Sequence, residues 1–359
     1  MFRSFTIENF RCFRNLTLPS LERINLIAGK NNSGKTALLE AIHLHSYPRD
    51  CVLPFTINVQ RGISAEKKFD EDSCSWLFHD KDGASGFELQ SQSVTKEKRT
   101  LQVWLMDTAA AEERFPQLAA MMRQVPRSPW AGGYGRSLIL KATANGSETF
   151  AIANAYSTES SDGIGSIGSS ADPWDGPSLF LSSSGRSLEE DAAAFSELEL
   201  TNRQDEILPS LRILEARLQR LAILLLANRP VIHGHIGLSR QVPVQFMGEG
   251  IRRLLSILLA INRAKGGNVL IDEIENGLHH SVMVPVWTAI VEAARRAEVQ
   301  VFATTHSYEC IQAARQAFEA QKLSDLRLFR LDRIDGGIRV ADYNQEILNT
   351  SLDMSLEVR

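Results

Sequence analysis

Apolar and polar residues alternate along the first part of the chain, which predicts β structure over residues 1–28. Phe5 and Ile7 alternate with polar neighbours, and the segment 24–28 is apolar except for Asn25. Further strand candidates, separated by loop-like segments such as 126–135, lie at 86–92, 100–106, 137–142 and 149–155. This part of the chain is therefore expected to hold an antiparallel sheet and an insertion.

The pattern changes to helical spacing between residues 187 and about 228, with a break near Pro209. Leucines recur there at intervals of three and four residues, at Leu211, Leu214, Leu218, Leu221 and Leu225. Such a stripe predicts a core-facing helix or one that pairs with another helix, and it is too short to indicate a coiled coil. We expect 181–230 to be a helical segment and a candidate dimer or partner contact.

Strand and helix alternate in the last third of the chain. An amphipathic helix is predicted over 250–264, a fully apolar strand over 269–271, and a second helix from about Ser281. Further strands are predicted at 299–304, 326–331 and 338–340. This order is typical of a mostly parallel α/β sheet.

Composition narrows the class of protein only slightly. The 359 residues carry a net charge of −4, which gives no general attraction to nucleic acid. The four cysteines, Cys12, Cys51, Cys74 and Cys310, form no C-x-x-C pair, so neither a disulfide framework nor a zinc site is indicated. The most apolar run, 221–227, is too short to span a bilayer, and we expect a cytoplasmic protein.

Residues 157–178 are rich in Ser, Gly, Asp and Pro, which predicts a flexible loop that serves as a connector or a lid. We divide the chain into four parts on these patterns. They are 1–50, the first part of an α/β unit; 51–180, a β-rich portion with the insertion; 181–230, the helical segment; and 231–359, the rest of the α/β unit.

The segment 29–36 reads GKNNSGKT and fits the phosphate-binding pattern G-x-x-x-x-G-K-[ST] at every fixed position. A predicted strand precedes it and a predicted helix follows it, as this pattern requires. Glycines let such a loop fold into a nest of N–H donors, to which the helix N-terminus adds positive charge. The loop residues Gly29, Asn31, Asn32, Ser33 and Gly34 are therefore expected to bind ATP, with Lys35 on the β- and γ-phosphates and Thr36 on Mg²⁺.

Two further strands end in polar residues. The apolar strand 269–271 runs into Asp272 and Glu273, where the first carboxylate suits Mg²⁺ and the second a general base for an attacking water. The strand 299–304 is followed by His306, which could contact the γ-phosphate or be structural. Open α/β sheets bind their ligands at the carboxyl ends of strands. The phosphate loop, the acidic pair and His306 each follow a predicted strand, so together they predict one nucleotide site.

The order GKNNSGKT, MGEGIRRLL, VLIDEIENGLHHS and VFATTHS resembles ABC-type ATPases of the RecF/SMC/OLD class, most closely the bacterial OLD-like ATPases of phage-defence operons. The opening FTIENFRCFRNLTL is similar to the N-terminal strands of that class. The resemblance covers roughly 1–48 and 230–359. It implies an α/β P-loop head, Mg-ATP sandwiched between two heads, and a separately encoded effector such as a nuclease.

Residue by residue, the resemblance makes Lys35 and Thr36 the Walker A pair, Asp272 and Glu273 the Walker B pair, and His306 the switch histidine. Three residues, Gly248, Gly250 and Arg253, match the segment that contacts ATP across the dimer. The chain departs from the family there, since Gly248 stands where a serine is common, and a simple turn and helix cap would have the same residues. The interlobe glutamine has one candidate, Gln60.

Two other functions remain open at the level of sequence. The ATP-binding subunit of a membrane transporter shares this chemistry, but about 235 residues separate Thr36 from Asp272 and no L-S-G-G-Q segment occurs. A small-molecule phosphotransferase would need an acceptor site under a lid, for which 157–178 is the candidate. We also expect the chain alone to cut no DNA, because the acids after His306 are scattered and the pair Asp272 and Glu273 is assigned to ATP.

Overall fold

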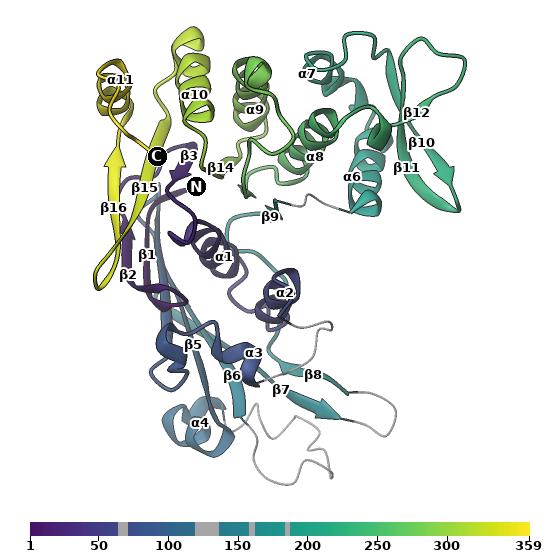
Figure 1. Cartoon of the computed structure of the whole chain (residues 1–359). Helices are drawn as coiled ribbons and strands as arrows, with labels where there is room; N and C mark the ends of the chain where they lie inside the picture. Colours follow the sequence, from purple (N-terminus) through teal and green to yellow (C-terminus); the bar gives the residue numbers. More distant parts are fainter. Residues whose placement is uncertain (64–70, 119–135, 158–161, 184–186) are drawn as a thin grey trace.

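The computed structural model describes residues 1–63, 71–118, 136–157, 162–183 and 187–359. Among these residues the strands form three sheets, of seven, six and three strands. Figure 1 shows the three-stranded sheet at one side of the molecule and the last strand of the six-stranded sheet at the opposite side.

The seven-stranded sheet is antiparallel at every pairing. Its strands, in spatial order, are β2 (Phe13–Leu18), β1 (Phe2–Phe10), β4 (Phe87–Ser93), β5 (Lys98–Asp107), β6 (Arg136–Ala144), β7 (Ser147–Ser157) and β8 (Asp162–Ile167). The strands expected at 1–28 and at the four later positions up to 155 are confirmed. The loop expected at 126–135 lies outside the described residues.

The six-stranded sheet is parallel except for one edge strand. Its order is β16 (Gly337–Tyr343), β15 (Leu326–Ile334), β3 (Ile24–Ala28), β14 (Gln300–Thr305), β13 (Asn268–Ile271) and β9 (Ser178–Leu181). Only β16 runs antiparallel to its neighbour. The expected segments 1–50 and 231–359 therefore meet in one sheet, where β3 lies between β14 and β15.

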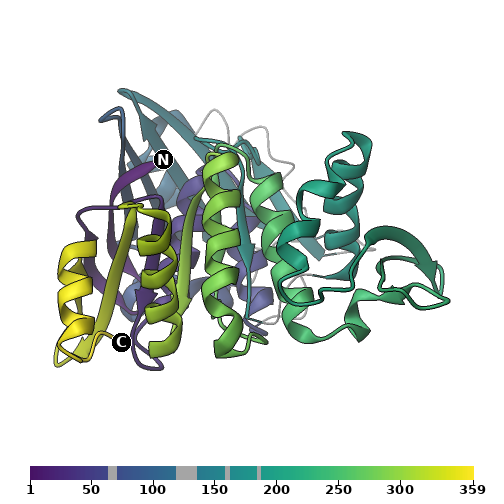
Figure 2. The same cartoon turned by 90° about the horizontal axis from the view of Figure 1, so that it is seen from above.

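Side chains that alternate along these strands enter two different cores, because successive residues of a strand point to opposite faces. Val269 and Ile271 pack with α8 (Glu249–Arg263), α9 (Met283–Arg296) and α10 (Tyr308–Gln321). Figure 2 shows these helices in a row with α11 (Gln345–Asp353). Leu270 and Phe302 face the other way, toward α1 (Lys35–Ser46) and the antiparallel sheet. The fold is thus a layered α/β P-loop NTPase head with an added antiparallel sheet.

The prediction of helix over 187–228, with a break near Pro209, is wrong beyond Leu211. The chain forms α6 (Leu188–Leu200) and the short α7 (Leu208–Leu211), and then a hairpin of β10 (Arg220–Leu226) and β11 (Arg229–His235), joined to β12 (Val242–Pro243). Ala227 and Asn228 form the two-residue turn, both with positive φ, as a hairpin turn of the primed type requires. The spacing of the leucines suited a helix, but this turn and the β-branched residues after it select the strand.

The prediction of a flexible loop over 157–178 is wrong for part of that segment. Residues 162–167 form β8, which pairs with β7, and Ser178 begins β9. Trp174 packs its ring edge-on against His45, with 4.6 Å between the ring centroids. Residues 158–161 lie outside the described part of the chain. Within the described ranges, no helix is long and apolar enough to cross a membrane.

Candidate nucleotide site

The phosphate loop joins β3 to α1, as the sequence predicted. Its two glycines have backbone conformations that other residues rarely adopt, with φ of +146° at Gly29 and +95° at Gly34. Space is also restricted, because a Cβ at Gly34 would lie 2.8 Å from the ring of Phe13. Gly34, the N-cap residue of α1, has no side chain that could accept a hydrogen bond from the first turn of the helix. The N–H groups of that turn therefore remain available to a bound phosphate.

Lys35 and Thr36 begin α1 and point toward different partners. The Lys35 ammonium donates hydrogen bonds to the carbonyls of Gly29, at 2.7 Å, and Lys30, at 3.0 Å. Burial lowers the pKa of Lys35, while nearby carboxylates such as Asp272 act in the opposite direction. The Thr36 hydroxyl donates to Asp272 Oδ2 at 3.0 Å. The loop is thereby linked to the acid at the end of β13.

Thr304, on the strand that lies between β3 and β13, fixes both acids. Its hydroxyl donates to Asp272 Oδ1 at 2.6 Å and accepts the backbone N–H of Glu273 at 2.8 Å. Glu273 has a φ of +49°, an uncommon conformation for a residue with a side chain and one that clusters at functional sites. This turn explains how adjacent residues can serve one site, because Asp272 and Glu273 both line the cavity beside the loop.

The residues at this point fit Mg²⁺. The ion prefers oxygen ligands at about 2.1 Å, and two neighbouring ligands of an octahedron then lie about 3 Å apart. The 3.0 Å between Thr36 Oγ1 and Asp272 Oδ2 matches this separation. The buried Ser33 hydroxyl of the loop has no hydrogen-bond partner among the described residues, so it can accept or donate a bond to a bound phosphate. The described residues contain no cluster of three or more His, Cys, Asp or Glu that would hold a metal by itself.

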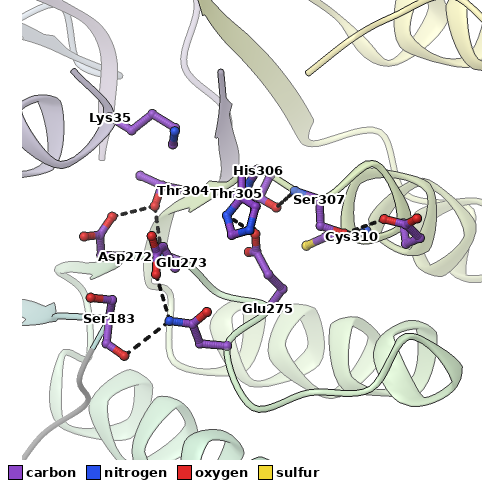
Figure 3. Close-up of polar contacts among 12 residues, drawn as sticks. Lys35, Ser183, Asp272, Glu273, Glu275, Thr304, Thr305, His306, Ser307 and Cys310 are labelled. Atoms are coloured by element: carbon purple, nitrogen blue, oxygen red, sulfur yellow. Dashed lines mark hydrogen bonds and ion pairs between the residues drawn. The ribbon is translucent and has the colours of Figure 1, made fainter. Parts of the chain in front are cut away.

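His306 lies close to Glu275, which the sequence analysis did not single out (Figure 3). One oxygen of Glu275 accepts the backbone N–H of His306 at 2.8 Å and lies 3.0 Å from its Nδ1. The imidazole is 52% exposed, whereas the Glu275 side chain is 12% exposed. Glu273 has its own polar partner, since Asn276 Nδ2 donates to its Oε2 at 2.8 Å. The carboxylates of this turn are therefore held individually.

Arg253 lies inside the chain, at 3% exposed, and donates hydrogen bonds to the backbone carbonyls of Ser182 and Asp272, at 2.8 and 2.6 Å. Its contact with the nucleotide of a second head stays a prediction. Burial lowers the pKa of Arg253, opposed by the charge of Asp272. The polar pattern at the start of α8 was read correctly as a helix start, but the side chain stabilises the turn after β13 from within the chain.

Gly248, Gly250 and Gln60 are not among the residues that line the cavity. Gly248 is the N-cap of α8 with a φ of +113°, and a Cβ at Gly250 would lie 2.9 Å from the carbonyl of Gly277. Gln60 ends α2 (Leu53–Gln60) and is exposed. A contact between the two glycines and a second head remains a prediction, as does the role of Gln60.

The cavity beside the loop has a volume of about 820 Å³ and holds several residues that the sequence analysis missed. Two of them, Arg11 and Arg61, share the buried carboxylate of Glu40, at 2.8 and 2.6 Å. Trp76 is 52% exposed, and the Lys81 ammonium lies 3.8 Å from the centre of its ring. Arg333 reaches the same cavity from β15. A cavity with so many cationic side chains suits an anionic ligand. These residues were missed because they lie far apart in the chain and belong to no local motif.

A parallel sheet that carries this loop and these two acids at its strand ends is the framework of a P-loop NTPase, and the second, antiparallel sheet gives it the form of an SMC-type head. Comparison with a solved structure supports the fold. The chain resembles the structure described as "Crystal structure of the SmcHead bound to the C-winged helix domain of ScpA" with a TM-score of 0.52, 12% identity, and coverage of 96% of this chain and 98% of that one.

Family models and curated proteins agree with this class. Residues 1–85 match the family "AAA ATPase domain", and residues 149–311 match "AAA domain, putative AbiEii toxin, Type IV TA system". A Helicobacter pylori protein named "ATP/GTP phosphatase" is 23% identical over 93% of both chains. "DNA replication and repair protein RecF" of Chlorobium phaeovibrioides is 51% identical over 41 residues, 11% of each chain. The chain is thus similar to AAA-type and SMC-like ATPases, while the OLD-like subclass remains a prediction.

Proposed function

We propose that this chain binds Mg-ATP and hydrolyses it to ADP and phosphate. The observation that carries the proposal is the series of hydrogen bonds from Thr36 to Asp272, to Thr304 and on to the backbone of Glu273. It joins the phosphate loop, the two acids and the intervening strand in one arrangement at the cavity. A structural turn would not require a polar contact at each of these strand ends.

Each side chain has a role that follows from its position. Lys35 leaves its two loop carbonyls to neutralise the β- and γ-phosphates. Thr36 and Asp272 would hold Mg²⁺, and the ion would screen the phosphate charge. Glu273 accepts the proton of the attacking water, and Asn276 fixes the carboxylate oxygen that is not used. His306, oriented by Glu275, contacts the γ-phosphate.

The hydrolysis assay is the direct test. Glu273→Gln should keep nucleotide binding and lose about 10²–10⁴-fold in phosphate release, the usual range for a general base. The matched control is Glu292→Gln, an exposed glutamate on α9, which should hydrolyse at the wild-type rate. Release of phosphate without any acceptor separates hydrolysis from phosphotransfer. GTP belongs in the same assay because of the name of the Helicobacter pylori relative.

We further propose that two heads close on ATP, with the Gly248-Glu249-Gly250 turn of one facing the nucleotide of the other. In a Glu273→Gln variant, excess Mg-ATP should raise the mass that light scattering measures above that of the same protein without nucleotide. A variant that binds ATP without any change in mass would contradict the sandwich without affecting the assignment of Lys35 and Asp272.

The cycle is proposed to control a separately encoded effector, such as a nuclease of phage defence or DNA repair, in the cytoplasm. The support is the family resemblance in the sequence and the similarity to heads whose solved structure includes a bound partner protein. Purified protein should not cleave DNA with Mg²⁺ or Mn²⁺, with or without ATP. Cleavage that survives purification and disappears with Asp272→Asn would overturn this part of the proposal.

A further inference from the structure

Among the described residues, no strand pairs with the outer edge of β10, which leaves backbone groups exposed there. The three-stranded sheet has the order β10, β11, β12, so β10 is an edge. Leu226 pairs with Arg229 across the two-residue turn, and residues next to such a turn exchange both backbone hydrogen bonds. The same bonding recurs at every second residue. The N–H and C=O groups of Leu221, Ile223 and Leu225 must therefore point away from β11.

Pro230 supports this assignment independently. It lies opposite Leu225 in the register of the two strands, and proline has no N–H to donate. The position is suitable for proline only because no hydrogen bond is exchanged there. Beyond the ladder with β11, none of the described residues hydrogen-bonds the backbone of Leu221, Ile223 or Leu225.

The side chains at the end of this hairpin are also unusual for a free surface. Leu224, Leu225 and Leu226 are 42%, 72% and 46% exposed, and no charged residue occurs between Arg220 and Arg229. Edge strands are normally protected by charges, proline or a bulge. The edge strand β16 of the larger sheet, for comparison, contains an arginine and an aspartate, and β12 ends in a proline. Charge occurs in β10 only at its first residue, Arg220, and from Leu221 to Leu226 its edge has none of these protections.

We propose that β10 pairs in antiparallel fashion with β10 of a second copy of this chain, with Ile223 on the two-fold axis. In this register Ile223 faces Ile223, and Leu221 faces Leu225 of the second copy. These are the residues whose backbone groups point outward, so every pair exchanges two hydrogen bonds. Arg220 lies opposite Leu226, and no like charges oppose each other. The interface is isologous, as closed two-fold symmetry requires.

This contact does not depend on nucleotide. Figure 1 places the hairpin at the periphery, on the far side of α6 and α8 from α1 and the phosphate loop. It therefore goes beyond the proposed ATP-dependent closure, and a chain that fails to bind ATP should still pair through β10. Each head would then have one permanent contact and one controlled by ATP.

Sedimentation of the full chain without nucleotide tests the pairing. Wild type and Lys35→Ala should both be dimers, and Leu225→Lys should be monomeric, because lysine at this edge discourages pairing and its side chain is already exposed in the monomer. Leu200→Lys is the matched control. Leu200 is 82% exposed on α6, away from any strand edge, so its replacement removes similar apolar surface and should leave the dimer intact.

Cysteine cross-linking tests the register. Across the two-fold axis the Cα atoms of Ile223 would lie about 5.5 Å apart, within the range of a disulfide. Ile223→Cys should therefore form a covalent dimer on mild oxidation. Leu225→Cys is more exposed but lies four residues from its own copy, about 13 Å along the strands, and should not form one.

Three results would overturn the proposal. They are a wild-type chain that is monomeric at all concentrations, a dimer that Leu225→Lys leaves intact, and oxidation that links Leu225→Cys in preference to Ile223→Cys. A monomeric chain whose β10 pairs with a strand of another protein would also overturn the proposal, as the first of these results. Far-UV circular dichroism of each variant confirms that the hairpin remains folded.

Discussion

Two sheet edges in this molecule expose polar groups, the first through side chains and the second through the backbone. At the carboxyl edge of the six-stranded sheet, Thr36, Asp272 and Thr304 come from distant parts of the chain and hold one another through side chains. At the outer edge of the three-stranded sheet, the exposed groups belong to the backbone of one continuous segment. The first edge is built to place a few atoms for a small ligand, whereas the second repeats along its length and suits another strand.

The comparison predicts that single side chains matter most at the first edge. Lys35→Ala should abolish measurable ATP binding, because it removes the mobile cation that the phosphate loop directs at the β- and γ-phosphates. Isothermal titration calorimetry with Mg-ATP is the measurement. Lys265→Ala, at an exposed position after α8, is the control and should bind ATP as the wild type does. Unchanged affinity of Lys35→Ala would remove the main ground for placing the nucleotide here.

Within one chain, the free energy of unfolding should depend on the hairpin mainly where the hairpin meets the body of the protein. Leu218 is 1% exposed at the base of β10, so Leu218→Ala should lower the free energy of unfolding by about 2–5 kcal/mol. Leu224→Ala, at the 42% exposed tip, should change it much less. Chemical denaturation of both variants at one protein concentration gives the comparison. Equal losses would mean that the tip is buried in the protein as it exists in solution.

Thr304→Val tests whether the hydroxyl of Thr304 at the first edge is needed for hydrolysis. It keeps the shape of the side chain but removes the hydroxyl that donates to Asp272 and accepts the N–H of Glu273. Leaving buried polar groups without a partner costs about 1–3 kcal/mol, so hydrolysis should fall about tenfold or more. Steady-state phosphate release measures it, with Thr304→Ser as the variant that retains the hydroxyl and most of the activity.

Acid should destabilise the region that carries the phosphate loop. Burial lowers the pKa of His43 to about 4 and of His45 to about 3, from an ordinary value of 6.5. The folded protein therefore excludes protons that the unfolded chain binds, and stability present above pH 6.5 is lost as the pH falls toward 4. The slope approaches about 1.4 kcal/mol per pH unit for each histidine.

Urea unfolding at several pH values measures this effect, and a variant separates it from carboxylate titration. His43→Asn should flatten the decline between pH 6.5 and 4 relative to the wild type. An identical slope in the two proteins would show that His43 is not excluded from protonation in the folded state.

The sequence predicted the parts of the fold that depend on neighbouring residues. The apolar segments 24–28 and 269–271 became β3 and β13, and the motif 29–36 lies between strand and helix as expected. The hairpin was missed because leucines spaced three and four apart fit a helix, while the decisive signal was the backbone conformation of Ala227 and Asn228.

The site was predictable only in its motif residues. Lys35, Thr36, Asp272 and Glu273 were assigned from strand ends, and the structure brings them to one cavity. The pairing of Arg11 and Arg61 with Glu40 was not visible, because these residues are separated by up to fifty positions and none belongs to a motif. The burial of Arg253 was not visible either, because sequence spacing does not report burial.

The position of β3 has a consequence for how the protein is made. All five of its residues are buried, and its neighbours in the sheet are β14 and β15, which lie some three hundred residues later in the chain. During synthesis this apolar strand cannot pair on both sides until β15, which ends at residue 334, has left the ribosome. Contacts of such long sequence separation form slowly, and unpaired apolar strands aggregate. We therefore expect the nascent chain to need chaperone protection, and ATP binding to appear only after β14 and β15 have been made.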